Sequence, residues 1–316
     1  MAQSSRRTYH LARCSYQADM SIKGWYLVAF ERDVVGELTP TYIGHQRLVL
    51  VREKGRLRAF DATCPHRGAH LAYGGRLCEG VIICPFHGHR ILLGNDRSER
   101  FSVSEYLVSS AGGMVFVRLS PEHDNGWTRY LEQLDRDQFI VNGFEMSVHA
   151  PMETVIDNAF DRRHFGAVHG VRTDDFSVYR SEEGALIVES KMYVPAGEMA
   201  EGQRALVPAP YRAFVPSPGL AAVELRGVAP YTVITGATNS PTGGCTIRLS
   251  LVFPKAAWTT PPPAAVCEPL LHHSRRGLDA DRLIWENLST SISPRWTPED
   301  RPSVEFLEFC RLHRDA

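Results

Sequence analysis

Short apolar runs separated by glycine, proline and charged residues dominate the chain from Gly24 to about Leu119. WYLVAF, LVLV and MVFVRL are the clearest of these runs. Runs of this length that are rich in β-branched and aromatic residues and bounded by turn residues are typical of strands. The pattern therefore predicts a small all-β domain with antiparallel strands over residues 20–120.

The rest of the chain mixes helical and strand patterns. Residues 121–150 are polar and mixed and indicate a connecting segment, and a helix is predicted from Glu153 to about Val168. Strand patterns follow in GALIVES, AAVELRG, YTVITGA and CTIRLSLVF. After the loop-like tract TTPPPAA, apolar positions return with helical spacing at 277–292 and 303–313. Residues 151–316 are therefore expected to form an α+β domain.

Composition and charge exclude several classes of protein. The chain is 43% hydrophobic and 22% charged with a net charge of −1, which gives no reason to expect nucleic acid as a partner. No apolar run approaches the roughly 20 residues of a membrane helix, and the first residues show no secretory signal. Seven cysteines are an odd number and too few for a disulfide scaffold, so we expect a reducing, cytoplasmic setting.

Two short stretches, CPHRGAH and CPFHGH, each combine a cysteine with a histidine. Together they give Cys64-x-His66, seventeen further residues, and Cys84-x-x-His87. Two thiolates and two imidazoles could hold zinc. Zinc fingers, however, usually pair cysteine with cysteine at short spacing, whereas a [2Fe–2S] cluster with two histidines on one iron needs this mixture.

Through CPHRGA and CPFHG at this separation, the sequence resembles the Rieske proteins. The resemblance implies a [2Fe–2S] cluster with its ligands divided between the irons: Cys64 and Cys84 on one, His66 and His87 on the other. High-potential Rieske proteins add a disulfide beside the cluster, but Ala69 and Phe86 occupy the corresponding positions here. This departure favours a potential in the lower part of the Rieske range, which suits oxygen chemistry.

His89 is a second departure, because oxygenase relatives usually carry tryptophan at this position. One interpretation is that His89 packs beneath the cluster loop. The other is that it hydrogen-bonds the cluster region and makes the potential depend on pH.

A second group of metal-ligand residues lies in DNAFDRRHFGAVHG. His164 and His169 are five residues apart and would diverge by about 140° on a regular helix, so both can face one metal only if the helix bulges or ends between them. The spacing alone therefore also fits two surface histidines. Asp161 precedes His164 by three residues, and Asn158 precedes Asp161 by three, which extends one helix face.

Asn-x-x-Asp-x-x-His-x4-His after a Rieske domain resembles the catalytic segment of the Rieske non-haem iron oxygenases. The pattern is most similar to vanillate O-demethylase and the ketosteroid hydroxylases. The resemblance implies that an α+β helix-grip (START-like) domain with an antiparallel sheet follows the Rieske domain. It also implies a mononuclear Fe(II) bound by a 2-His-1-carboxylate triad, with open positions for oxygen.

The resemblance places the third iron ligand on a late helix, where LDADRLIWEN offers Asp279 and Asp281. DRLIWEN resembles the Asp-x-x-Ile-Trp ending of the ketosteroid hydroxylases, so Asp281 is the expected ligand and Asp279 the alternative. Either aspartate also fits a plain helix charge. The resemblance gives Asp161 a different role: it links an iron-site histidine to a cluster histidine of a neighbouring subunit, which implies a homotrimer.

The expected function is that of a terminal oxygenase in a monooxygenase system. Electrons from NAD(P)H reach the chain through a separate reductase or ferredoxin, because no Gly-rich dinucleotide fingerprint is present. O₂ then hydroxylates or oxidatively dealkylates a hydrophobic ring substrate, with steroid-like and natural-product rings among the classes allowed. Arg162 and Arg163 fit either an intersubunit salt bridge or an anionic substrate. The alternatives are a Rieske electron-transfer protein without a catalytic iron and a zinc-stabilised binding module.

Overall fold

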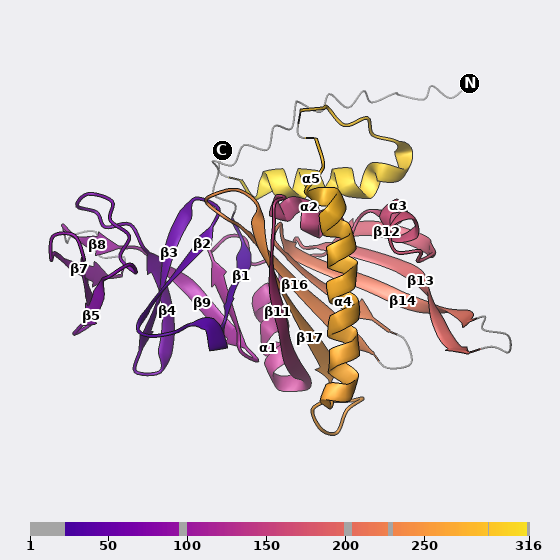
Figure 1. The fold of residues 1–316 in the computed structure, drawn as a ribbon, viewed down its shortest axis with the longest axis horizontal. Helices are drawn as coiled ribbons and strands as arrows, with labels where there is room; N and C mark the ends of the chain where they lie inside the picture. The colour runs from indigo at the N-terminus through magenta and orange to yellow at the C-terminus, as the bar shows by residue number, and fades with distance from the viewer. Residues whose placement is uncertain (1–22, 95–99, 199–203, 227–229, 290, 315–316) are drawn as a thin grey trace.

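The fold was analysed in a computed structural model, which describes residues 23–94, 100–198, 204–226, 230–289 and 291–314. Its described elements form three sheets and five α-helices. The two larger sheets lie next to each other along the long axis of the molecule, and the smallest sheet lies at one end (Figure 1).

The first large sheet has six strands in the order β1-β10-β9-β4-β3-β2. Its strands are β1 (Trp25–Phe30), β2 (Leu38–Ile43), β3 (Gln46–Glu53), β4 (Arg56–Asp61), β9 (Glu105–Ala111) and β10 (Met114–Arg118). A four-stranded sheet is inserted between β4 and β9 and comprises β5 (Arg76–Cys78), β6 (Val81–Ile83), β7 (Arg90–Leu93) and β8 (Ser102–Val103). The strand-rich region expected from Gly24 to Leu119 is therefore present.

The second large sheet has seven antiparallel strands in the order β11-β17-β16-β15-β14-β13-β12. These strands are β11 (Gln138–Val148), β12 (Thr173–Arg180), β13 (Leu186–Glu198), β14 (Arg204–Ser217), β15 (Leu220–Leu225), β16 (Tyr231–Asn239) and β17 (Cys245–Pro254). All four strand patterns found beyond residue 180 lie in this sheet. The predicted α+β arrangement is confirmed.

The segment 121–150, expected as a connection, instead contains helix α1 (Trp127–Asp137) and strand β11. β11 pairs with β17 from Gln138 to Val148, so the second sheet begins at Gln138. β11 is an edge strand whose residues are mostly half-buried, and six of its eleven residues are apolar. Phe144, Met146 and Val148 alternate with Glu145 and Ser147, but Asn142 and Gly143 interrupt the apolar pattern, so only part of the segment carries a strand signal.

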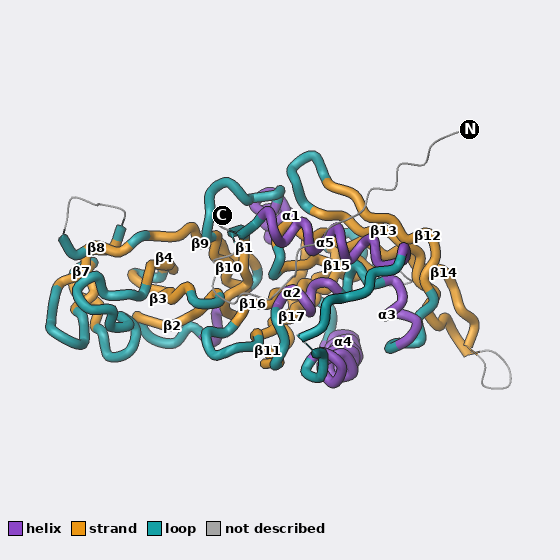
Figure 2. The backbone as a smooth tube through the Cα atoms, turned by 90° about the horizontal axis from the view of Figure 1, so that it is seen from above, coloured by secondary structure: helices purple, strands orange, loops and turns teal. Residues whose placement is uncertain are grey.

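Helices cover both faces of the seven-stranded sheet (Figures 1 and 2). On one face, α1 packs Trp127, Leu131 and Leu134 against buried side chains of β14 to β17. On the other, the long helix α4 (Ala264–Trp285) packs against β17. α5 (Arg301–Leu312) contacts α2 (Met152–Asp157) and β12. Among the described helices, none has both the length and the apolar character needed to cross a membrane.

Two predicted helices have different bounds in the structure. The helix expected from Glu153 to Val168 is divided into α2 (Met152–Asp157) and α3 (Arg162–Ala167). α4 begins at Ala264, inside the expected loop tract, and ends at Trp285, before residue 292.

The junction between the two large sheets depends on a glycine. A Cβ built on Gly236 of β16 would lie 2.4 Å from the Cβ of Leu27 on β1. Only glycine allows the two backbones to approach this closely. Tyr26 and Val28 of β1 consequently share one core with Ile247 of β17, which joins the first part of the chain to the second.

Candidate functional site

The two cysteine–histidine stretches form loops of matching geometry beside the small sheet. In each loop the cysteine N–H donates to the carbonyl five residues later, over 2.8 Å from Cys64 to Ala69 and 2.9 Å from Cys84 to His89. Each loop also contains a glycine with positive φ: Gly68 at 75° and Gly88 at 70°. The two loops each bring one cysteine and one histidine to the same space.

Burial separates the two kinds of ligand. Cys64 and Cys84 are each 2% exposed, whereas His66 and His87 are exposed, with ring centroids 4.7 Å apart. Burial raises the pKa of the Cys64 thiol, so a thiolate there needs a metal or another positive charge. Buried sulfur and exposed imidazole fit a cluster with its thiolate iron inside and its histidine iron at the surface.

His89 lies beside this surface. Its ring centroid is 4.5 Å from that of His66 and 4.6 Å from that of Phe101. Phe86 is 58% exposed at the tip of its loop. The contact with His66 supports both interpretations of His89, since a ring that packs on the loop also lies close to the cluster region.

The second candidate site forms where α3 ends. The helix stops at Ala167, so His169 lies beyond its last turn and is released from the helical spacing that would turn it away from His164. The Nε2 atoms of His164 and His169 are 2.8 Å apart. Asp281 Oδ1 is 2.9 Å from His164 Nε2 and 3.1 Å from His169 Nε2. Three ligand atoms within 4.8 Å of one another match a facial triad.

Neighbouring side chains hold His164 in place. Asn158 Nδ2 lies 3.1 Å from His164 Nε2, and the Trp285 indole N–H donates to Asn158 Oδ1 over 3.3 Å. Asp161 is the N-cap of α3, and its carboxylate accepts from the N–H groups of Arg163 and His164. The cap fixes the first turn of the helix that carries His164.

Asp281 and Asp279 have opposite environments. Asp281 is 5% exposed. Burial alone would raise its pKa, but hydrogen bonds from His164 and His169 outweigh this effect and lower the pKa below its ordinary value. Asp279 is 43% exposed and pairs with Arg275 and Arg282 along α4. Only Asp281 faces the histidines, and the donor set fits a divalent iron.

A cavity of about 280 Å³ opens onto these three residues. Its floor is the face of the seven-stranded sheet that α4 covers, and α2, α3 and α4 form its sides. Most of its lining is aliphatic or aromatic, including Val155, Ile156, Phe165, Met192, Val223, Leu225, Val233 and Leu249. Such a largely apolar cavity with a few polar groups is typical of small-molecule sites.

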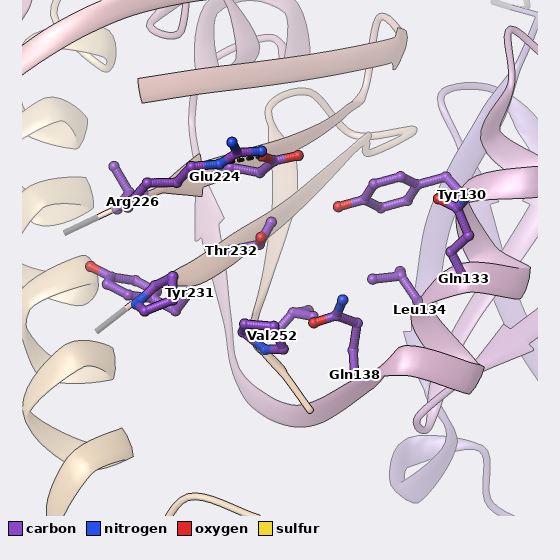
Figure 3. Close-up of a pocket in the computed structure, with 12 residues that line it drawn as sticks. Tyr130, Gln133, Leu134, Gln138, Glu224, Arg226, Tyr231, Thr232 and Val252 are labelled. Carbon is purple, nitrogen blue, oxygen red and sulfur yellow. Dashed lines mark hydrogen bonds and ion pairs between the residues drawn. The ribbon is translucent and has the colours of Figure 1, made fainter. Parts of the chain in front are cut away.

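Another hollow, of about 270 Å³, lies between α1 and the same sheet (Figure 3). Tyr130 points into it from α1, and Glu224 and Arg226 form an ion pair of 2.7 Å at its opposite side. No predicted metal ligand lines it. The predicted ligands of the mononuclear iron therefore lie at the cavity beside His164 and not at this hollow.

The structure brings His164, His169 and Asp281 together with Asn158, and Asp161 lies outside the cavity as the N-cap of α3. Arg162 and Arg163 do not line the cavity: Arg162 donates to the Thr173 carbonyl over 3.4 Å, and Arg163 pairs with Glu299 over 2.8 Å. Trp285 was not among the predicted residues. Its position four residues after Asp281, on the same face of α4, could have identified it.

The cluster loops and α3 lie at opposite ends of the molecule in both views (Figures 1 and 2).

Comparison with known proteins supports this description. A model of the Rieske [2Fe–2S] domain matches residues 24–99. Cholesterol 7-desaturase of Bombyx mori is 31% identical over 160 residues, which cover 46% of this chain and 35% of that protein. The oxygenase subunit of vanillate O-demethylase from Pseudomonas sp. strain HR199 is 24% identical, over 53% of this chain and 51% of that protein. The chain thus matches between a third and about half of these relatives' length.

Solved structures match over more of the chain. Dicamba monooxygenase bound to 3,6-dichlorosalicylic acid has a TM-score of 0.68 at 17% identity, covering 92% of this chain and 98% of that one. NdmB of Pseudomonas putida CBB5 has a TM-score of 0.66 at 20% identity, covering 92% and 90%. Residues 24–99 are a Rieske [2Fe–2S] domain, as predicted, and the chain has the fold of the Rieske oxygenases.

Proposed function

We propose that the chain is the terminal oxygenase of a Rieske monooxygenase system. The observation that carries this proposal is the convergence of His164, His169 and Asp281 at an apolar cavity, in a chain that also has a Rieske domain. A carrier of electrons alone has no use for a facial triad beside a substrate-sized cavity.

Two sets of residues would hold the metals: Cys64, His66, Cys84 and His87 for the cluster, and His164, His169 and Asp281 for Fe(II). When bound, these groups supply single electrons and a centre at which O₂ oxidises a substrate by hydroxylation or dealkylation. The chain's own residues position the metal ligands and the substrate. Trp285 holds Asn158 beside the metal-binding edge of His164, and the apolar walls exclude water and hold the substrate against the triad.

Asp161 is proposed to bridge His164 to a cluster histidine of a neighbouring subunit in a trimer. The separate positions of the cluster loops and α3 in one chain support this proposal. The exposed rings of His66 and His87 support it too, because they are accessible both to a neighbouring subunit and to a reductase. NAD(P)H would act through that reductase.

Replacing Asp281 tests the oxygenase directly, and Asp279 provides a matched control on the same helix. Asp281→Ala removes the only carboxylate of the triad, so the protein should keep its cluster absorption but lose the mononuclear iron and reductant-dependent O₂ consumption. Asp279→Ala removes an exposed ion pair and should change neither. Equal iron content in Asp281→Ala and the unsubstituted protein would instead favour the electron-transfer alternative.

A further inference from the structure

The cavity beside the triad has an unusual charge composition. Among its described lining residues there is no lysine, arginine or glutamate, and the one aspartate is Asp281, which faces the histidines. His273 lies at the rim and is exposed. Apart from the proposed Fe(II) and its ligand Asp281, the lining offers a charged ligand no opposite charge. Away from the iron, a carboxylate or an ammonium group would lose its hydration without compensation, which costs more than the transfer of a neutral group.

The polar side chains of the lining differ in whether they already have partners. Ser274 donates to the carbonyl of Leu270 over 2.9 Å. The Tyr211 hydroxyl donates to the carbonyl of Ala159 over 3.5 Å, and burial raises its pKa, so it stays neutral. Thr235 differs: within the described part of the chain its hydroxyl makes no hydrogen bond.

Thr235 lies on the cavity floor in the middle of β16. It pairs across the sheet with Ala221 on one side and Leu249 on the other, and both of these also line the cavity. Along its own strand, Val233 is its neighbour on the same face. The hydroxyl therefore stands alone in an apolar surface, and the small side chain of Ala221 leaves space beside it.

We propose that this cavity selects small, uncharged, mainly apolar substrates, and that the Thr235 hydroxyl positions them by a hydrogen bond to a hydroxyl, carbonyl or ether oxygen. This inference rests on the proposed function, whose substrate class it narrows. The volume of about 280 Å³ lies at the lower end for ligand cavities and favours compact ring systems. The preference for uncharged substrates distinguishes this chain from relatives that are named for the charged compounds vanillate and carnitine.

A series of ligands with one ring system and different charges tests the selection. The probes are 2-naphthol, naphthalene, 2-naphthoate and (2-naphthylmethyl)trimethylammonium, titrated by calorimetry in the absence of oxygen into the full chain with the metals that it holds as purified. 2-Naphthol should bind at least tenfold more tightly than either charged probe. Equal or tighter binding of the carboxylate or the ammonium would overturn the selection for neutral substrates, as would a failure of 2-naphthol to bind at millimolar concentration.

Substitutions at Thr235 test the positioning role. Thr235→Val keeps the shape and removes the hydroxyl, so 2-naphthol should lose roughly five- to tenfold in affinity while naphthalene loses nothing. Thr235→Ser keeps the hydroxyl and should retain the preference for 2-naphthol. Thr232→Val, on the opposite face of the same strand, is the control and should bind both probes as the unsubstituted chain does. Equal effects of Thr235→Val on the two probes would overturn the role of Thr235.

These measurements do not depend on turnover. A chain that consumes O₂ but prefers charged probes would refute the substrate class and leave the oxygenase intact. A chain that shows the predicted binding series but holds no mononuclear iron would refute the oxygenase and leave the selective cavity.

Discussion

Asp157, the last residue of α2, is a carboxyl group that is poorly suited to carry a charge. Its Oδ1 atom is buried and has no hydrogen-bond partner among the described residues. Burial raises its pKa to about 7, the charges of Asp161 and Asp300 add to this effect, and a hydrogen bond from Ser303 opposes it. The folded state therefore binds a proton at Asp157 between about pH 4 and pH 7 that the unfolded chain releases.

The stability of the folded chain therefore depends on pH through Asp157. Because the folded pKa lies above the unfolded value, stability from this group is present at low pH and is lost as the pH rises through 7. The side chain of Asp157→Asn cannot ionise. At pH 8 the free energy of unfolding of this variant should therefore exceed that of the unsubstituted protein by on the order of 2 kcal/mol, and its melting temperature should be higher. At pH 4 the two proteins should have similar melting temperatures. A variant that is less stable at both pH values would contradict this account.

At the scale of elements, Gly277 lowers the stability of helix α4 but leaves space in the cavity beside His169. It lies inside α4, and a Cβ there would meet only His169 Cε1, at 3.9 Å. Gly277→Ala should therefore raise the stability of the protein by about 0.5–1 kcal/mol in chemical denaturation. The new methyl group would project into the cavity, so binding of the larger probes should weaken.

An exposed residue of the same helix serves as the reference for this substitution. Ala280→Gly should lower stability by a similar amount and leave ligand binding unchanged. A lower stability of Gly277→Ala would contradict this prediction, because it would mean that the space beside His169 cannot accept a methyl group.

The elements also show what the sequence could and could not predict. The matched CPHRGA and CPFHG loops were predictable because their ligands lie within short segments of fixed spacing. Whether His164 and His169 face one metal was ambiguous, because their spacing alone does not show that α3 ends at Ala167. Asp279 and Asp281 are two residues apart on α4 and so face different directions. The orientation of that helix, and the edge strand β11, depend on packing against distant residues.

At the scale of the whole molecule, the proposed electron path crosses between subunits and can be tested by mixing variants. Cys84→Ala should destroy the cluster and leave the iron site, whereas Asp281→Ala should do the reverse. Each variant alone should be inactive, but co-assembled oligomers should regain measurable turnover, because the cluster of one chain would lie beside the iron site of the next.

A substitution of Asp161 tests whether this residue carries the transfer between subunits. Asp161→Asn placed in the Cys84→Ala chain should keep its iron, since asparagine also caps a helix, yet abolish the regained turnover. Mixed oligomers that remain inactive under every condition, or that are unaffected by Asp161→Asn, would argue against transfer between subunits.

The central claim is that one chain holds two different metal centres. Its most direct test is the content of iron and acid-labile sulfide per chain, with an absorption spectrum, in protein purified without oxygen. We expect roughly three irons and two sulfides, which corresponds to one [2Fe–2S] cluster and one mononuclear iron. About two irons and two sulfides that stay unchanged when Fe(II) is added would contradict the oxygenase and leave a Rieske electron carrier.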